Sequence, residues 1–193
     1  MLTKLEKPET IISIDETAKL VSSLLPLYRK FIKINGKRQC AEIRAMLRPI
    51  LYSCSEGRSA DYVSKQAKKL WDTDPYLKPL NLFYLTPRIA RQYKKTNSIF
   101  KQLLLEHCNP LSQVIAQLIP AKNEYEIQKI LRKELKTAWI TKPENLKLGK
   151  KKYKSNRFPI DKKGNRQKKS NWKECYRQCE IKIIDSNGKT VKF

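Results

Sequence analysis

Glycine is scarce in this chain, and the glycine-rich phosphate-binding motifs are missing. Only 5 glycines occur among 193 residues, and neither GxxxxGK[ST] nor GxGxxG is present. There is no GxSxG nucleophile elbow. The single histidine, His107, falls near the expected end of a helix, which is typical of a structural side chain. These absences argue against ATPases, dinucleotide-binding enzymes and serine hydrolases.

Long apolar runs and paired cysteines are also missing. No apolar stretch reaches the roughly 18 residues of a transmembrane helix, and the N-terminus lacks the apolar region of a secretory signal. The 5 cysteines include no CxxC pair, and Cys175 with Cys179 offers only half of the ligands that zinc needs. We therefore expect reduced thiols, no metal or other cofactor, no membrane partner, and a cytoplasmic location, or a nuclear one in a eukaryote.

Acidic residues are few, and the excess of basic residues is uneven. The 42 Lys and Arg against 18 Asp and Glu give a formal net charge of +24. Residues 147–193 hold sixteen of the basic residues and four acids, which is half of that net charge. The densest part, 147–169, has eleven basic residues and the single acid Asp161. Such concentrated charge needs an anionic partner, and nucleic acid is the commonest one for a soluble protein.

Apolar residues at helical spacing fill most of the chain before residue 137. Ser13 and Glu16 form a capping-box pattern, and Thr86-Pro87 places a capping hydroxyl before a proline. Neither a repeated period nor strand alternation occurs in this part. The pattern therefore predicts about six helices, near residues 13–35, 38–52, 59–71, 86–104, 111–119 and 123–137.

The composition changes near Lys142-Pro143. The basic stretch that follows has almost no aliphatic residues, with a short strand expected around 157–160. Apolar residues alternate from Cys179 to Ile183, and Asp185–Gly188 is a typical turn before a last short strand. We predict a mainly α protein of the α+β type: a helical bundle in residues 1–141, then a basic segment and a small C-terminal β-hairpin in residues 142–193.

Basic side chains in the C-terminal segment, with aromatic residues among them, are candidate nucleic-acid contacts. Lysine outnumbers arginine there, which favours contact with phosphate charge over bidentate reading of bases. Tyr153, Phe158 and Trp172 could stack on unpaired bases. Basic faces of the upstream helices extend this surface. The candidate set is Lys150, Lys151, Lys152, Tyr153, Lys154, Arg157, Lys162, Lys163, Arg166, Lys168, Lys169 and Trp172, with Arg44, Arg48, Lys65, Lys68, Lys69, Arg88, Arg91 and Lys95 on the helices.

We therefore expect a protein that binds RNA or DNA through the phosphate backbone. Several separated basic patches suit a non-catalytic subunit that lies along nucleic acid, together with other protein subunits, in a larger ribonucleoprotein or protein–DNA assembly. The helical subunits of CRISPR effector complexes are one class of similar size and composition. A basic module that binds an acidic protein is an alternative.

A second alternative comes from two short motifs near the C-terminus. Pro159-Ile160-Asp161 and Glu180-Ile181-Lys182 together resemble the PD-(D/E)XK pattern of metal-dependent nucleases. The resemblance implies that Asp161 and Glu180 would hold Mg²⁺ and that Lys182 would assist the attacking water. The chain departs from the family's pattern because Asp161 lies among lysines, where the family has an apolar strand.

Overall fold

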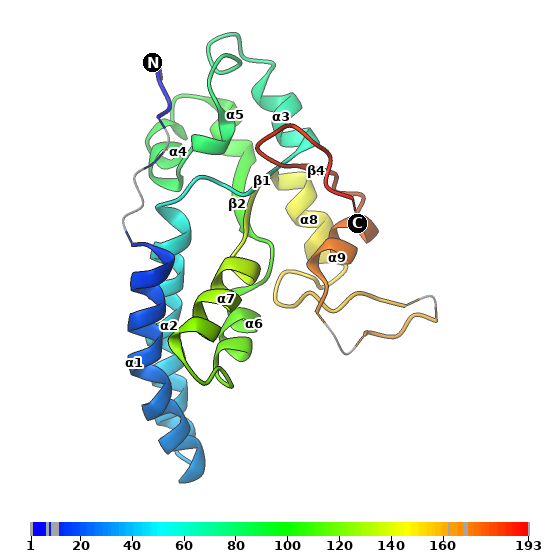
Figure 1. Ribbon diagram of the computed structural model, residues 1–193. Coiled ribbons are helices and arrows are strands. Elements are labelled where there is room, and N and C mark those ends of the chain that lie inside the picture. The colour runs from blue at the N-terminus through cyan, green and yellow to red at the C-terminus, as the bar shows by residue number, and fades with distance from the viewer. Residues whose placement is uncertain (1, 7, 9–11, 162, 168–169, 193) are drawn as a thin grey trace.

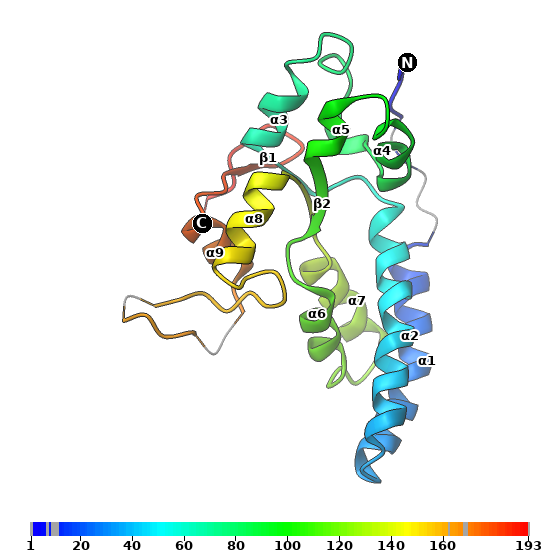
Figure 2. The same ribbon diagram turned by 180° about the vertical axis from the view of Figure 1, so that it is seen from behind.

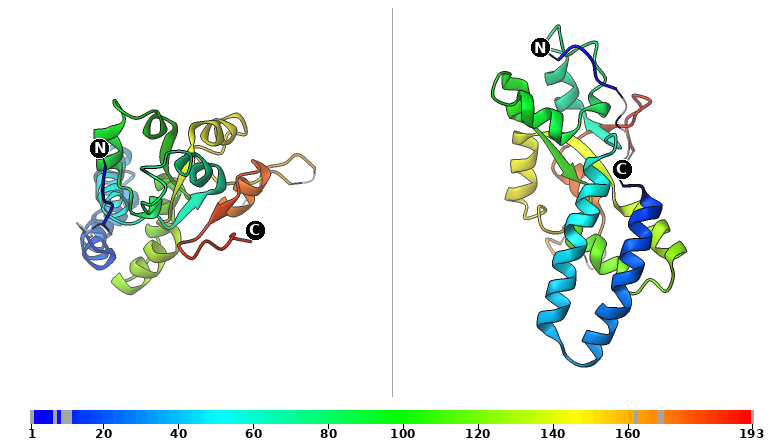
Figure 3. Two further views of the ribbon diagram at one scale, coloured as in Figure 1. Left: turned by 90° about the horizontal axis from the view of Figure 1, so that it is seen from above. Right: turned by 90° about the vertical axis from the view of Figure 1, so that its left-hand side faces the viewer.

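The chain begins with a long helical hairpin. A computed structural model describes residues 2–6, 8, 12–161, 163–167 and 170–192. Helices α1 (Ile14–Lys33) and α2 (Lys37–Glu56) run side by side and extend beyond the rest of the molecule (Figures 1 and 3). The expected capping box opens α1: Ser13 Oγ accepts a hydrogen bond from the Glu16 amide, and the Glu16 carboxylate accepts one from the Ser13 amide.

Two shorter helices close a first hydrophobic core against this hairpin. Helix α6 (Leu111–Leu118) packs on α2, and α7 (Glu124–Glu134) packs on α1. Each of the four helices places apolar residues at helical spacing on the side that faces the others. The fully buried residues of this first core include Val21, Leu25, Tyr28, Leu47, Leu51, Val114 and Leu131.

A four-stranded sheet lies beside the helical core. Strands β1 (Tyr62–Ser64), β2 (Leu103–His107), β3 (Thr137–Thr141) and β4 (Ile183–Ile184) are arranged in the order β2-β3-β1-β4. Strand β1 is parallel to β3, whereas β2 pairs with β3 and β4 pairs with β1 in antiparallel fashion. All residues of β3 are buried, which is typical of a central strand with both faces covered.

Helices cover the two faces of the sheet and form two further cores (Figure 2). On the face of Trp139 lie α3 (Lys65–Trp71), the 3-10 helix η1 (Leu82–Tyr84), α4 (Pro87–Tyr93) and α5 (Ser98–Gln102). On the face of Ala138 and Ile140 lie α8 (Lys142–Lys150) and α9 (Trp172–Gln178). The Trp139 indole donates a hydrogen bond of 2.9 Å to the Leu85 carbonyl, so its polar atom is satisfied in the core.

The predicted class, mainly α with a smaller β part, is confirmed, but the position of the sheet differs from the expectation. Strands β1, β2 and β3 all come from the part expected to be helical. They were missed because none shows alternation: β1 has three residues, β2 starts with a continuous apolar run, and β3 is buried on both faces. The C-terminal hairpin is confirmed: Ile184 bridges to Thr190 across the Asp185–Gly188 turn. Cys179, where the expected alternation begins, is the C-cap of α9, and β4 starts only at Ile183.

The expected boundary between residues 141 and 142 falls at the junction of β3 and α8. Thr141, the last residue of β3, is also the N-cap of α8 and forms a capping box with Glu144. The third core contains residues from both sides of this junction, such as Cys108 and Ile183. None of the helices in the described part of the chain is long and apolar enough to cross a membrane.

Candidate nucleic-acid interface

One face of α2 presents a row of exposed side chains. Arg44, Arg48 and Tyr52 follow at intervals of four residues, so neighbouring members are about 6 Å apart along the helix axis. The residue before each of them is buried in the first core. The row is therefore fixed on a helix that tertiary packing holds in place.

The row borders a hollow of about 560 Å³ between α2, the end of β2, the start of α6 and the loop after α8. Figure 2 shows β2 and α6 on the same side of α2. The charged, polar and aromatic side chains that line it include Arg48, Tyr52, Glu106, His107, Ser112 and Lys154. A second hollow of about 280 Å³ shares Arg48 and Ser112 with the first and adds Arg44. The two hollows together are called the α2 groove below.

A buried arginine lies next to the one acid that lines the groove in the described part of the chain. Arg157 is fully buried, and its Nη2 atom lies 2.7 Å from Glu106 Oε1. Its Nε atom donates to the Cys108 carbonyl at 2.8 Å, and the guanidinium lies 5.8 Å from the centre of the Tyr176 ring. Burial raises the pKa of Glu106, and the positive charge of Arg157 opposes that rise. Because the charge of Arg157 offsets that of Glu106, Glu106 does not cancel the attraction of Arg44, Arg48 and Lys154 for an anion.

His107 forms the back of the groove as a neutral side chain. Burial, and secondarily the charge of Arg157, lowers its pKa to about 4. Its Nε2 atom lies 2.8 Å from Ser55 Oγ, and that hydroxyl donates to the Tyr52 carbonyl at 2.8 Å. Because the Ser55 hydrogen is used there, Nε2 must be the donor to Ser55. The imidazole ring lies 5.7 Å from the ring of Tyr52.

Gln113, at the start of α6, binds the loop that carries Lys154 at two points. The Gln113 side-chain oxygen accepts hydrogen bonds from the Arg157 amide at 3.2 Å and from Ser170 Oγ at 2.9 Å. Between these points, residues 158–161 and 163–167 extend away from the body of the molecule (Figure 1). The groove is therefore assembled from segments about 110 residues apart in sequence, from Arg44 to Lys154.

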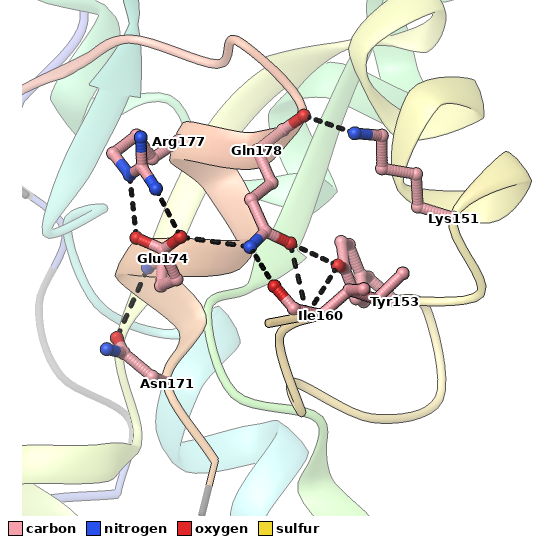
Figure 4. Close-up of polar contacts among 7 residues, drawn as sticks. All are labelled: Lys151, Tyr153, Ile160, Asn171, Glu174, Arg177 and Gln178. Carbon is pink, nitrogen blue, oxygen red and sulfur yellow. Dashed lines mark hydrogen bonds and ion pairs between the residues drawn. The ribbon is translucent and has the colours of Figure 1, made fainter. Parts of the chain in front are cut away.

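Gln178 of α9 also binds the same loop, through hydrogen bonds with Tyr153 and Ile160 (Figure 4). Its side-chain oxygen accepts from the Ile160 amide at 3.2 Å and from the Tyr153 hydroxyl, and its Nε2 atom donates to the Ile160 carbonyl at 2.6 Å. The Gln178 carbonyl accepts from Lys151 Nζ at 2.7 Å. Both backbone polar groups of Ile160 are thus satisfied by one amide side chain.

Replacing Gln178 by alanine is expected to lower the free energy of unfolding by about 1–3 kcal/mol. The variant leaves the Ile160 carbonyl without its partner and loosens the loop on α9. Urea denaturation measures the first effect, and faster hydrogen exchange of the Ile160 amide measures the second. Gln66→Ala is the control, because Gln66 is exposed on α3. Equal stability of the two variants would contradict this role of Gln178.

Three residues expected at the surface are part of the buried structure instead. Tyr153 and Arg157 are fully buried and Trp172 is 8 % exposed, so they are removed from the candidate contacts. Tyr153 and Trp172 pack in the third core, where Trp172 contacts Tyr62 and Tyr176. Tyr153 and Trp172 therefore anchor the basic segment to the sheet.

Apart from Lys154, the other candidates in the basic segment divide into three groups. Lys150, Lys151, Lys152 and Lys163 are exposed. Arg166 is also exposed, but its guanidinium donates to the Lys151 and Phe158 carbonyls and lies 5.5 Å from the Tyr153 ring, so it closes the loop. The remaining candidates, Lys162, Lys168 and Lys169, lie outside the described residues.

The candidates on the upstream helices form a second cluster and a scattered group. Lys65, Lys68 and Lys69 of α3 surround a shallow hollow of about 520 Å³ next to β4, and Lys68 pairs with Asp72 at 2.5 Å. Arg88, Arg91 and Lys95 are exposed on α4 and the turn that follows it. Arg91 is 3.6 Å from Glu56, at the end of α2.

The two acids of the nuclease-like pattern are engaged elsewhere. The Asp161 carboxylate accepts hydrogen bonds from the amides of Lys163 and Asn165, which makes it the centre of a turn. Glu180 is exposed and lies 3.6 Å from Lys147, while Lys182 is exposed beside β4. Within the described ranges no group of three His, Cys, Asp or Glu side chains is placed to hold a metal ion. The geometry gives the nuclease alternative no support.

Comparisons with protein-family models, curated proteins and solved structures find no match for this chain. Its function is therefore inferred from the chemistry of the groove. Of the groove residues, the sequence pointed to Arg44, Arg48 and Lys154. It missed Tyr52, Glu106 and His107, although a polar Glu-His pair directly after the apolar run Leu103–Leu105 was a usable signal.

Proposed function

We propose that the protein binds RNA or DNA through phosphate contacts along the α2 groove. The observation that carries this proposal is the convergence of Arg44, Arg48 and Lys154 on one groove from distant parts of the chain. None of the ion pairs found among the described residues includes any of these three cations. Their charge is therefore available to an external anion.

The surroundings of the groove favour an extended polyanion over a single small anion. Leu111 and Ser112, at the start of α6, line the groove, and α6 begins without a side-chain cap, so its positive dipole end adds to the attraction. The exposed Lys150, Lys151 and Lys152 lie at the end of α8, shortly before Lys154. A net charge of +24 supplies long-range steering toward a nucleic acid.

We also propose that the protein works without catalysis, as a subunit of a larger ribonucleoprotein or protein–DNA assembly. The α3 lysines and the α2 groove are separate basic surfaces. Two such surfaces suit a subunit that follows a nucleic-acid strand and contacts it more than once.

A salt series tests the proposal. Fluorescence anisotropy would measure binding to matched single- and double-stranded RNA and DNA between 50 and 300 mM salt. We expect log Kd to depend steeply on log salt concentration. The triple variant Arg44→Gln/Arg48→Gln/Lys154→Gln should reduce that slope by about 2 to 3, because each lost phosphate contact removes about 0.7–0.9 from it.

The control removes the same amount of charge elsewhere. Lys19→Gln/Lys30→Gln/Lys129→Gln changes exposed lysines of α1 and α7 that line neither hollow of the groove. It should leave most of the slope in place. Equal slopes for the two triple variants would show that the phosphate contacts do not lie in the α2 groove. Flat or absent binding on all four nucleic acids would overturn it and favour an acidic protein as the partner.

A further inference from the structure

Tyr52 is an exposed aromatic residue in the middle of a basic groove. Its side chain lines the larger hollow, and the residue is 44 % exposed. The ring is supported from behind, because His107 lies 5.7 Å away and the rings are inclined at 44°. Ser55, hydrogen-bonded to both His107 and the Tyr52 carbonyl, fixes this pair. The ring is therefore held in place before any ligand binds.

Cations from two separate elements line the same hollow as this ring. Arg48 is one helical turn before Tyr52 on α2, and Lys154 lines the same hollow from the loop after α8. The neutral His107 adds no charge behind the ring, and Glu106 is paired with Arg157. The hollow thus offers one flat apolar surface beside two unpaired positive charges, a combination that matches a base joined to a phosphate.

We propose that the hollow beside Tyr52 is a nucleotide subsite for single-stranded nucleic acid, where one unpaired base stacks on Tyr52 and the adjoining phosphate lies between Arg48 and Lys154. This inference rests on the proposed function and narrows its substrate class. In a duplex both faces of each base are covered by neighbouring bases, so stacking on Tyr52 requires an unpaired base. Aromatic stacking tolerates any base, so the subsite distinguishes single strands from duplexes but hardly distinguishes one base from another.

Substitutions of Tyr52 test the subsite. The probes are a fluorescein-labelled 12-nucleotide poly(dT) or poly(U) strand, a 12-base-pair DNA duplex of mixed sequence, and AMP as a free mononucleotide. Tyr52→Ala should weaken binding of the strands roughly 5- to 150-fold and leave duplex binding unchanged. The salt slope should stay the same, because no charge is removed. Tyr52→Phe and Tyr52→Trp keep a ring and should bind the strands like the unchanged protein.

A second measurement uses the unchanged protein and does not depend on how the variants fold. Ultraviolet crosslinking of a strand that contains 5-iodouracil, followed by mass spectrometry, should place the crosslink on Tyr52.

Binding of AMP as tight as that of the strands would show a mononucleotide site and overturn the strand assignment. Equal losses for strand and duplex, no loss in Tyr52→Ala, or a crosslink elsewhere would overturn the inference while the salt-dependent groove contacts still stand. If no nucleic acid binds with a salt slope, the proposed function fails and the subsite fails with it.

Discussion

Replacing Arg157 by methionine is expected to lower the free energy of unfolding by about 3–5 kcal/mol at neutral pH. The guanidinium is fully buried and bonds to Glu106 and to the carbonyls of His107 and Cys108. Methionine fills much of the volume but leaves a largely buried carboxylate without its partner and two carbonyls without a donor. Urea denaturation followed by circular dichroism measures the loss.

The same variant should regain stability as the pH falls. Burial already holds the pKa of Glu106 above its usual 4.5, and the loss of Arg157 removes the charge that opposes this rise. Between pH 4.5 and the raised pKa, Glu106 of the folded variant therefore keeps a proton that Glu106 of the unfolded chain has released. The contribution of Glu106 to the stability of the variant is greatest below about pH 4.5 and decreases as the pH rises through the raised folded pKa. The deficit relative to the unchanged protein should therefore be larger at pH 8 than at pH 5.

The double variant Arg157→Met/Glu106→Leu separates the effect of the charge from that of the lost volume. Without a buried carboxylate it should recover much of the stability lost in Arg157→Met, and its remaining deficit should lose the part of the pH dependence that comes from Glu106. A double variant as unstable as the single one would show that packing of the arginine side chain, and not its charge, stabilises the structure.

Local signals in the sequence predicted the helices well because caps act over three or four residues. Ser13 caps α1 and Thr86 caps α4 as expected, with the acceptor and donor atoms that each pattern predicts. Asn109-Pro110 has the same pattern of a capping residue before a proline, but the Asn109 amide bonds to Glu134, and α6 begins after Pro110 without a side-chain cap. A capping residue can be diverted when a buried carboxylate from another helix is within reach, and no local pattern shows that.

The central strands could not be predicted because their signal depends on partners far away in sequence. Thr137–Thr141 is buried on both faces, so it has no alternation, and Tyr62–Ser64 is only three residues long.

The groove also depends on contacts between residues far apart in sequence, which local patterns do not show. Spacing predicted that Arg44 and Arg48 share a face of one helix, but Glu106, His107 and Lys154 join them only through the sheet and the loop. Tyr153 and Trp172 were misassigned because charged neighbours hid their packing against the third core.

Strands β1 and β3 are parallel, so their C-terminal ends lie at the same end of the sheet. A basic helix begins directly after each of them. Ser64 ends β1 and caps α3, which carries Lys65, Lys68 and Lys69. Thr141 ends β3 and caps α8, which leads into the basic loop. Glu144 joins the two caps: one of its carboxylate oxygens accepts from Ser64 Oγ at 2.6 Å, from the Thr141 amide at 2.8 Å and from Thr141 Oγ at 3.0 Å. A single buried acid therefore fixes the starts of both helices.

Replacing Glu144 by alanine is expected to lower the free energy of unfolding by about 3 kcal/mol. The change removes three hydrogen bonds to a carboxylate, leaves the buried Ser64 hydroxyl without an acceptor, and removes negative charge from the N-terminus of α8. Thermal or urea denaturation measures the loss. Hydrogen exchange at the backbone amides of Ala67 and of residue 144, which donate to the two capping hydroxyls, should become faster in the variant.

Glu144→Gln is the matched control because it keeps the shape of the side chain. All three donors reach the same oxygen, Oε2, while Oε1 is buried without a partner. The glutamine oxygen can take the place of Oε2, and its NH2 group then occupies the position of the unpartnered oxygen. The three hydrogen bonds survive in neutral form, so we expect a loss of only about 1 kcal/mol. Losses of equal size in the two variants would mean that the charge of Glu144, rather than its bridging of the two caps, holds α3 and α8 at the edge of the sheet.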